Sequence, residues 1–207
     1  MIIDAHTHHL TASGITSVEP ANFDPQPGRL YSVGIHPWHT HDVGDDTLQL
    51  LEQYAQHPQV VAIGETGMDT LRGAPLQRQA QVFEKHLQLA QKLDKPVIIH
   101  CVRTSQQIVA LCRHHGVTVP CAIHGMRSNE RVAKPLIDAG FYLSFGPRFN
   151  PATVLSTPRD RILIETDDCD TTILEVATLL SPTLGLTPAD ILALAGNNLH
   201  HFLTATD

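Results

Sequence analysis

The sequence lacks the features that would place it among disulfide-rich or membrane proteins. Its 207 residues include only four cysteines without C-x-x-C spacing, which favours buried free thiols over a disulfide framework. No hydrophobic run approaches the length of a membrane span, so we expect no membrane association. Asp4 and His6 interrupt the first apolar stretch and no basic segment precedes it, so we expect no signal peptide. Together these absences predict a cytoplasmic protein.

Basic residues are also scarce. The chain has 14 Lys and Arg against 21 Asp and Glu, a formal net charge of −7. This balance argues against sequence-independent coating of nucleic acid, which needs a basic surface. Local action on a phosphodiester stays open, because bound divalent cations would reverse the charge of one cleft. The length and the 42% hydrophobic content predict one domain over residues 1–207. No obligate protein partner is evident.

What the chain has in quantity is histidine, at 14 residues. Residues 2–5 are typical of a buried strand, and side chains two apart in a strand share a face, so His6 and His8 point the same way. Two imidazoles on one face can hold a metal ion. About one H-x-H pair is expected by chance at this histidine content. The second pair, His39 and His41, lies in a polar loop with no strand before it and is a weaker candidate.

Apolar segments followed by polar ends alternate with helical patterns along the chain. We expect strands at 2–5, 15–18, 30–35, 60–63, 96–99, 117–123, 141–145 and 161–165. Helices are predicted from residue 45 or 46, over 76–90, from 104 to 116, from 128 to 140, from 187, and in a last short helix from 197 or 198 to 203. This alternation predicts an α/β fold with a parallel sheet. A TIM-type (β/α) barrel fits the strand number best, abbreviated or irregular near residues 11–29, and an open doubly wound sheet is the alternative.

Potential metal ligands recur at the carboxyl ends of these strands. They are His6, His8, His36, Glu65, His100, His124 and Asp167. In a barrel such ends face one mouth, and unpaired polar groups there would cost stability unless a ligand compensates. Nitrogen and oxygen donors without thiolate suit Zn, Mn, Co or Mg, and six or so ligands from this set exceed one tetrahedral site. Two ions ~3.5–4 Å apart sharing a carboxylate would use them all, which predicts metal-assisted hydrolysis.

The order of these motifs resembles the TatD family of metal-dependent deoxyribonucleases, within the amidohydrolase-like superfamily. The resemblance rests on Asp4-x-His6-x-His8, Gly34-Ile35-His36-Pro37, Gly64-Glu65-Thr66-Gly67-Met68-Asp69, Pro96-Val97-Ile98-Ile99-His100, Ile123-His124-Gly125 and Glu165-Thr166-Asp167. It implies a TIM-type barrel, one or two divalent ions (Mg, Mn or Zn), and hydrolysis of DNA phosphodiesters, with DNA or another phosphodiester as the binding partner.

The resemblance also implies roles for individual residues. His6 and His8 would hold the first ion with Asp167, and Glu65 would bridge to the second ion. His100 and His124 would complete the second site. Asp167 is the expected proton acceptor, so Glu65 and Asp167 are the catalytic candidates.

Substrate contacts and the reaction itself have alternatives. Arg103 and Arg127 follow two ligand strands, where they would either grip phosphate oxygens or pair with loop acids. His36 is a third candidate for substrate contact. A hydrolase of C–N or ester bonds is the rival enzyme, although such relatives often bridge their ions with a modified lysine and no lysine stands at a strand end. The remaining alternative is a metal-binding protein without catalysis.

Overall fold

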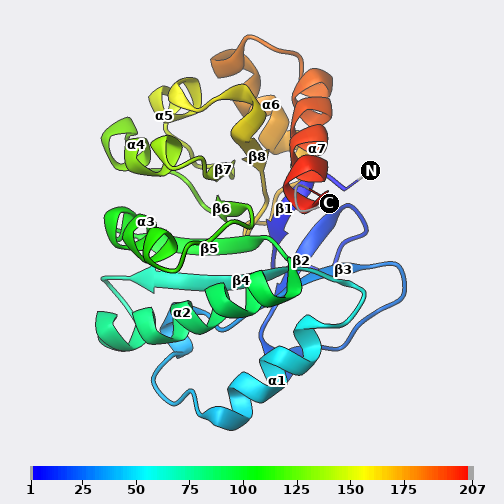
Figure 1. The fold of residues 1–207 in the computed structure, drawn as a ribbon. Helices are drawn as coiled ribbons and strands as arrows, with labels where there is room; N and C mark the ends of the chain where they lie inside the picture. The colour runs from blue at the N-terminus through cyan, green and yellow to red at the C-terminus, as the bar shows by residue number, and fades with distance from the viewer. Residues whose placement is uncertain (1, 205–207) are drawn as a thin grey trace.

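The computed structural model describes residues 2–204 and forms a closed barrel of eight parallel strands in chain order (Figure 1). The strands are β1 Asp4–Thr7, β2 Gly14–Val18, β3 Leu30–Val33, β4 Val60–Asp69, β5 Val97–Val102, β6 Cys121–Ile123, β7 Tyr142–Phe145 and β8 Ile162–Ile164. The barrel closes where Asp4 of β1 pairs with Ile164 of β8. The predicted TIM-type barrel is therefore confirmed, and the open sheet is excluded.

Helices cover the outside of the barrel (Figure 1). They are α1 Asp45–Ala55, α2 Leu76–Leu93, α3 Ser105–His114, α4 Glu130–Asp138, α5 Pro151–Ser156, α6 Ile173–Leu184 and α7 Pro188–Thr204. Their limits follow local chemistry. Thr172 and Glu175 exchange side-chain and backbone hydrogen bonds in a capping box at the start of α6, and Gly185 ends that helix in the left-handed conformation.

The buried apolar side chains form two groups on either side of the strands. One lies between the barrel and the outer helices and includes Phe83, Leu87 and Phe145. The other fills the barrel interior with side chains from seven of the eight strands, namely Ala5, Ile15, Ala62, Ile98, Ala122, Tyr142 and Leu163. Leu199 and Phe202 of α7 pack against this interior group. The interior is thus a solid core, and functional groups are confined to the strands' carboxyl ends.

The predicted irregularity near residues 11–29 is present. Among the described residues, β1 and β2 are joined without a helix, and β2 and β3 are joined by a segment whose only helix is the 3-10 turn Pro20–Asn22. A full barrel unit would place an α-helix in each connection. The shortened connections explain how eight strands fit into this chain length.

Several predicted boundaries were wrong. The first strand is Asp4–Thr7 rather than 2–5, and β4 continues from the predicted 60–63 to Asp69 because β5 pairs with it as far as Val102. The strand predicted at 117–123 is only Cys121–Ile123, since Pro120 has no backbone N–H for a ladder.

The predicted separate helix at the end of the chain was also wrong. Residues 188–204 form one continuous helix, α7. The Asn198 side chain does not cap a new helix, because it donates to the carbonyls of Arg159 and Ile162 at 2.7 and 2.8 Å. The short helix α5 and the limits of α6 had not been predicted.

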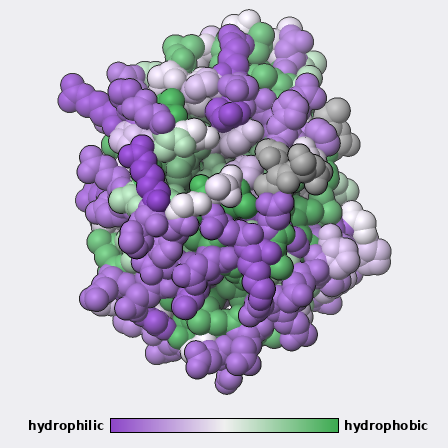
Figure 2. All heavy atoms as spheres, viewed as in Figure 1, coloured by the Kyte–Doolittle hydropathy of each residue, from purple (hydrophilic) through white to green (hydrophobic). Residues whose placement is uncertain are grey.

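Among the described residues, no single helix is long and apolar enough to cross a membrane. Only α6 and α7 together pass that test of length and composition, and they are bent by 104° relative to one another. The face shown in Figure 2 is largely hydrophilic, with apolar areas between the polar side chains.

Candidate metal centre

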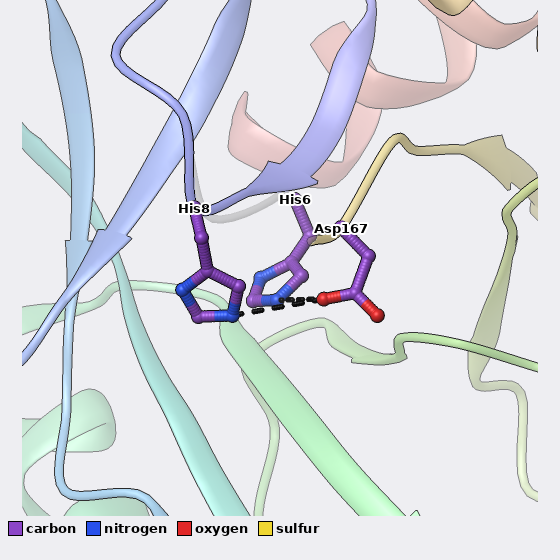
Figure 3. A group of neighbouring side chains, drawn as sticks. All are labelled: His6, His8 and Asp167. Carbon is purple, nitrogen blue, oxygen red and sulfur yellow. Dashed lines mark ion pairs between the residues drawn. The ribbon is translucent and has the colours of Figure 1, made fainter. Parts of the chain in front are cut away.

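His6, His8 and Asp167 converge at the carboxyl end of the barrel (Figure 3). His6 belongs to β1, His8 follows it, and Asp167 follows β8. The backbone brings them together, because Asp167 N donates to His6 O and His8 N donates to Asp167 O, both at 3.0 Å. The Nε2 atoms of His6 and His8 lie 3.5 and 3.6 Å from Asp167 Oδ1. Residues about 160 positions apart in the sequence thus share one site.

Glu65 stands at the centre of the cluster, in β4. Its Oε1 lies 2.9 Å from His36 Nε2, 2.8 Å from His100 Nδ1 and 2.8 Å from His124 Nε2. Its Oε2 instead faces the two histidines near β1, at 3.3 and 3.4 Å from their Nε2 atoms. Each oxygen of this carboxylate therefore faces its own histidines, and the rings of His6 and His124, which face different oxygens, lie 4.3 Å apart between centroids.

Period-two alternation explains part of this convergence. His100 follows the interior residue Ile98 by two positions, and His124 follows Ala122 in the same way, so both imidazoles continue the inward face of their strands. Glu65 does not obey this rule, because the pairing register of β4 and β5 shifts between Ile63 and Thr66.

Glycine permits the close approach of β4 to β5 at this point. Gly64 and Gly67 have φ values of 144° and 136°, and a Cβ on either would lie 2.4 or 2.1 Å from a carbonyl oxygen of β5. Gly64 and Gly67 therefore allow β4 to lie close to β5, which brings the Glu65 carboxylate within reach of His100.

A second layer of hydrogen bonds holds His100 in place. Asp69 Oδ2 lies 3.2 Å from His100 Nε2 and accepts a hydrogen bond from Trp38 Nε1 at 2.7 Å. Gln79 in turn fixes the Asp69 backbone, accepting from its N–H at 2.7 Å and donating to its carbonyl at 3.0 Å. A carboxylate behind a histidine sets the orientation of the ring, as in many metal sites.

Asp4 supports the opposite side of the centre. It is buried, and it accepts from the backbone N–H of His6 at 3.3 Å and of Thr166 at 3.1 Å. The Thr166 hydroxyl donates to its other oxygen at 2.7 Å. Burial raises the pKa of Asp4 to about 6 despite these hydrogen bonds. The carboxyl group ties the start of β1 to the residue before Asp167.

The histidines and carboxylates of the cluster shift each other's pKa values. Burial and His124 oppose protonation of His6, but Asp167 and Glu65 raise its pKa to about 9. Burial likewise disfavours charge on His124, yet Glu65 and Glu165 raise its pKa well above the ordinary value. Burial favours the neutral carboxyl groups, but the surrounding histidines hold the pKa of Glu65 well below its usual range and bring that of Asp167 to about 2. The site is built to hold ionised carboxylates beside positive charge.

The donor atoms fit a metal ion. His6 Nε2 is fully buried and has no hydrogen-bond partner, although Glu65 Oε2 lies 3.3 Å away. Two ligands bound to one tetrahedral ion at the usual Zn–N and Zn–O lengths would be ~3.3 Å apart. Four sets of three residues have donor atoms within 4.8 Å of one another, namely His6, His8, Asp167; His6, Glu65, His124; His36, Glu65, His100; and His124, Glu165, Asp167. The spacing of these donor atoms thus agrees with the metal ligands predicted from the sequence.

Above the centre lies a cavity of about 930 Å³ that includes His36, Glu65, His100, His124 and Asp167 in its wall. Four exposed arginines also line it, at positions 72, 103, 127 and 148. In the part of the chain that the structure describes, none of them forms an ion pair with a carboxylate. The alternative that Arg103 and Arg127 pair with loop acids is therefore not observed.

Comparison with known proteins identifies the family. The family model described as TatD related DNase matches residues 21–198. The chain belongs to the TatD family. Its resemblance to that family, read from the motifs, is thus confirmed.

TatD-family relatives with curated sequences are similar over about two thirds of this chain. The "Uncharacterized metal-dependent hydrolase YabD" of Bacillus subtilis is 32% identical over 148 residues, which cover 66% of this chain and 57% of the relative. The "3'-5' ssDNA/RNA exonuclease TatD" of Erwinia billingiae is 30% identical over 154 residues, covering 69% and 59%. The chain thus spans little more than half the length of these relatives.

A solved structure of a TatD homologue has the same fold. The YJJV protein of Escherichia coli K12 superimposes with a TM-score of 0.83 at 21% identity, covering 92% of this chain and 85% of that one. At this low sequence identity, the structural similarity establishes the barrel fold but gives no information about the activity.

The structure brings all six predicted metal ligands together and places the three predicted substrate contacts in the cavity wall. Four features of the site had not been predicted: the hydrogen bond from Trp38 to Asp69, the buried Glu165 beside His124, and the cavity arginines Arg72 and Arg148. Of the residues involved, only Asp69 and Glu165 could have been noticed in the sequence, since both lie within the TatD-family motifs. Trp38, Arg72 and Arg148 belong to loops that reach the mouth of the barrel.

Proposed function

We propose that this chain is a divalent-metal-dependent hydrolase that cleaves phosphodiester bonds in DNA, acting from a strand end as an exonuclease. The observation that carries the proposal is Glu65, whose two oxygens face two different groups of imidazoles. This is the arrangement expected of a carboxylate shared by two ions. The names of the metal-dependent hydrolases and of the exonuclease among its relatives agree with it.

The residues divide between the two proposed ion sites. His6, His8 and Asp167 would hold the first ion, His100 and His124 the second, and Glu65 would belong to both. The ions, Mg, Mn or Zn, would lower the pKa of a bound water and neutralise phosphoryl oxygens. Asp167 is 30% exposed toward the cavity, and its position beside His6 and His8 supports it as the proton acceptor.

A phosphate-bearing substrate is supported by the charge of the cavity wall. Arg103 and Arg127 are exposed and free of carboxylate partners among the described residues, in a chain whose net charge is −7. Guanidinium groups bind phosphate oxygens in a bidentate manner. His36 lies 2.9 Å from Glu65 and lines the same cavity, which supports it as a substrate contact beside the ions.

Hydrolysis of a C–N or ester bond in a small substrate has less support. No lysine lines the cavity among the described residues. Lys95 lies at the opposite end of the barrel strands, where its Nζ donates to the carbonyls of Ala55 and Val60. Glu65 therefore occupies the central position that a modified lysine would need.

The test is cleavage of labelled single- and double-stranded DNA by protein stripped with EDTA, with and without added Mg, Mn or Zn. We expect cleavage only with metal, and an absence of cleavage under every condition would refute the proposed function. Glu65→Ala and Asp167→Asn should each lose turnover by orders of magnitude while their thermal unfolding stays cooperative. His200→Ala, an exposed histidine on α7, is the matched control and should retain activity. The expected cytoplasmic location and the absence of an obligate partner stay predictions.

A further inference from the structure

Trp38 occupies an unusual position for the only tryptophan of the chain. It lies in the 3-10 turn Pro37–His39, two residues after His36, and its side chain is 38% exposed. Its ring centroid is 4.6 Å from that of His36 and 5.9 Å from that of His100, in edge-on arrangements. An exposed indole thus stands at the edge of the candidate metal centre.

Arg72 packs on this indole. Its guanidinium carbon is 4.6 Å from the Trp38 ring centroid, a cation–π contact, and both residues line the cavity. The neighbouring Leu71 also lines the cavity and is 60% exposed. Packing of the fold does not require an indole, a guanidinium and an aliphatic side chain to meet at an open cavity wall.

The indole and the guanidinium group offer flat faces, and Leu71 adds apolar surface beside them. Unpaired nucleobases bind to proteins mainly by stacking on aromatic rings and on guanidinium planes. A nucleotide joins its phosphate to its base through a single sugar, so a base contact belongs next to the phosphate site. Trp38 and Arg72 stand in that place, beside the imidazoles of His36 and His100.

We propose that Trp38 and Arg72 form a stacking surface for an unpaired nucleobase of the substrate, next to the bond that is cleaved. The inference rests on the proposed function. It restricts the substrate further, because the faces of a base within a duplex are already stacked on its neighbours. A single-stranded end, the substrate class in the name of the Erwinia billingiae relative, fits this contact, and an abasic residue at that position binds more weakly.

The fluorescence of Trp38 tests this contact without any need for catalysis. We would titrate the Mg²⁺-loaded protein with deoxyadenosine monophosphate and, as the matched probe, with deoxyribose 5-phosphate, which lacks only the base. Stacking predicts saturable quenching by the nucleotide and little change with the sugar phosphate. Equal responses to the two probes, or none, would overturn the proposal whether or not the protein proves to be a nuclease.

Two substitutions separate stacking from the hydrogen bond to Asp69. Trp38→Phe and Trp38→Leu both remove the indole N–H, but only the first keeps an aromatic ring. Binding of a fluorescein-labelled, phosphorothioate-linked single-stranded oligonucleotide should weaken by about tenfold, or about 1.4 kcal/mol, in Trp38→Leu and much less in Trp38→Phe. Equal losses in the two variants would assign Trp38 a purely positioning role through Asp69 and contradict the inference.

Arg72→Gln should weaken binding of the same oligonucleotide by several-fold, and Arg131→Gln, an exposed arginine of α4 outside the cavity, should not. An oligonucleotide with an abasic end should bind wild type and Trp38→Leu alike. A loss at the abasic end that equals the loss at a normal end would refute the base contact. If the base contact is present but no DNA is cleaved, the stacking surface stands and the proposed nuclease activity fails.

Discussion

Glu65 is the side chain that the two groups of histidines share. Burial alone would favour its protonated form, and the imidazoles of His124, His100 and His36 reverse that preference, holding its pKa well below the usual range. The same residue would be destabilising if its partners were removed, because a buried unpaired charge is costly. At the scale of single residues, the site is a set of groups that tolerate burial only together.

His86 shows how a buried histidine serves the fold instead of the site. Its Nε2 accepts from the backbone N–H of Ile35 at 2.9 Å, and its Nδ1 donates to the Val82 carbonyl at 2.8 Å. Burial lowers its pKa from 6.5 to about 4. A second ring proton would point at the N–H of Ile35, so the fold requires the neutral ring.

This histidine should make the protein sensitive to acid. Because its pKa is lower in the folded state than in the unfolded state, its stabilising effect is complete above pH 6.5 and is lost as the pH falls toward 4. The loss amounts to about 3 kcal/mol over that interval. In His86→Gln, where the side-chain oxygen can still accept from Ile35, the free energy of unfolding should fall less steeply between those pH values. The exposed His114→Gln variant should keep the wild-type slope in urea titrations at each pH.

Among the described helices, α7 is the one whose side chains pack against the apolar core inside the barrel. Its residues Leu199 and Phe202 are almost fully buried and pack against the group of apolar side chains inside the barrel. The Phe202 ring meets that of Tyr142 edge-on, at 5.2 Å between centroids. The functional groups lie at the carboxyl ends of the strands, so this helix stabilises the barrel without contacting the candidate metal centre.

Phe202→Ala should therefore destabilise the fold and spare the site. Removing a buried phenyl ring costs about 3–5 kcal/mol, which lowers the melting temperature of a domain of this size by roughly 10 °C. His201→Ala, the exposed neighbour on the same helix, should leave the melting temperature almost unchanged. Metal-dependent activity measured well below the transition should be similar in both variants. A selective loss of activity in Phe202→Ala would show that the helix also shapes the mouth.

For the whole molecule, the distribution of charge matters more than its sum. The net charge is −7, yet the cavity wall carries four exposed arginines without carboxylate partners among the described residues. A protein of this kind is expected to hold a few phosphates near its site and to repel the rest of a long nucleic acid. That behaviour suits an enzyme that trims ends better than a processive one.

The dependence of binding on salt measures how many phosphates are held. For single-stranded DNA the slope of log K against log salt is about −0.7 per phosphate contact, so contacts from the three cavity arginines outside the stacking surface predict a slope no steeper than about −2. Replacing both Arg103 and Arg127 by Gln should reduce its magnitude by about 1.4. Arg131→Gln should leave it unchanged. A much steeper slope in the wild type would mean an extended binding surface and would contradict the end-trimming mode.

The sequence alone determined the fold class and the identity of the candidate ligands. Alternation of apolar strands with amphipathic helices is a local property, and it sufficed to predict a parallel barrel with a shortened region near residues 11–29. The polar residues ending those strands, from His6 to Asp167, could be named because parallel strands of a barrel must end at one mouth. His100 and His124 follow this rule directly, two positions after an interior residue.

Only the tertiary structure decided what depends on register and on loops. The continuation of β4 to Asp69 and its register shift come from pairing with β5, a contact between segments distant in sequence. Together with Gly64 and Gly67 they explain how Glu65 reaches the histidines on both of its sides. Trp38 and Arg72 meet at the cavity because two loops fold over the same mouth, and no periodicity reports where a loop will lie. Local patterns specify which face a side chain takes along a regular strand, whereas irregular strands and loops acquire their positions only from the contacts of the complete barrel.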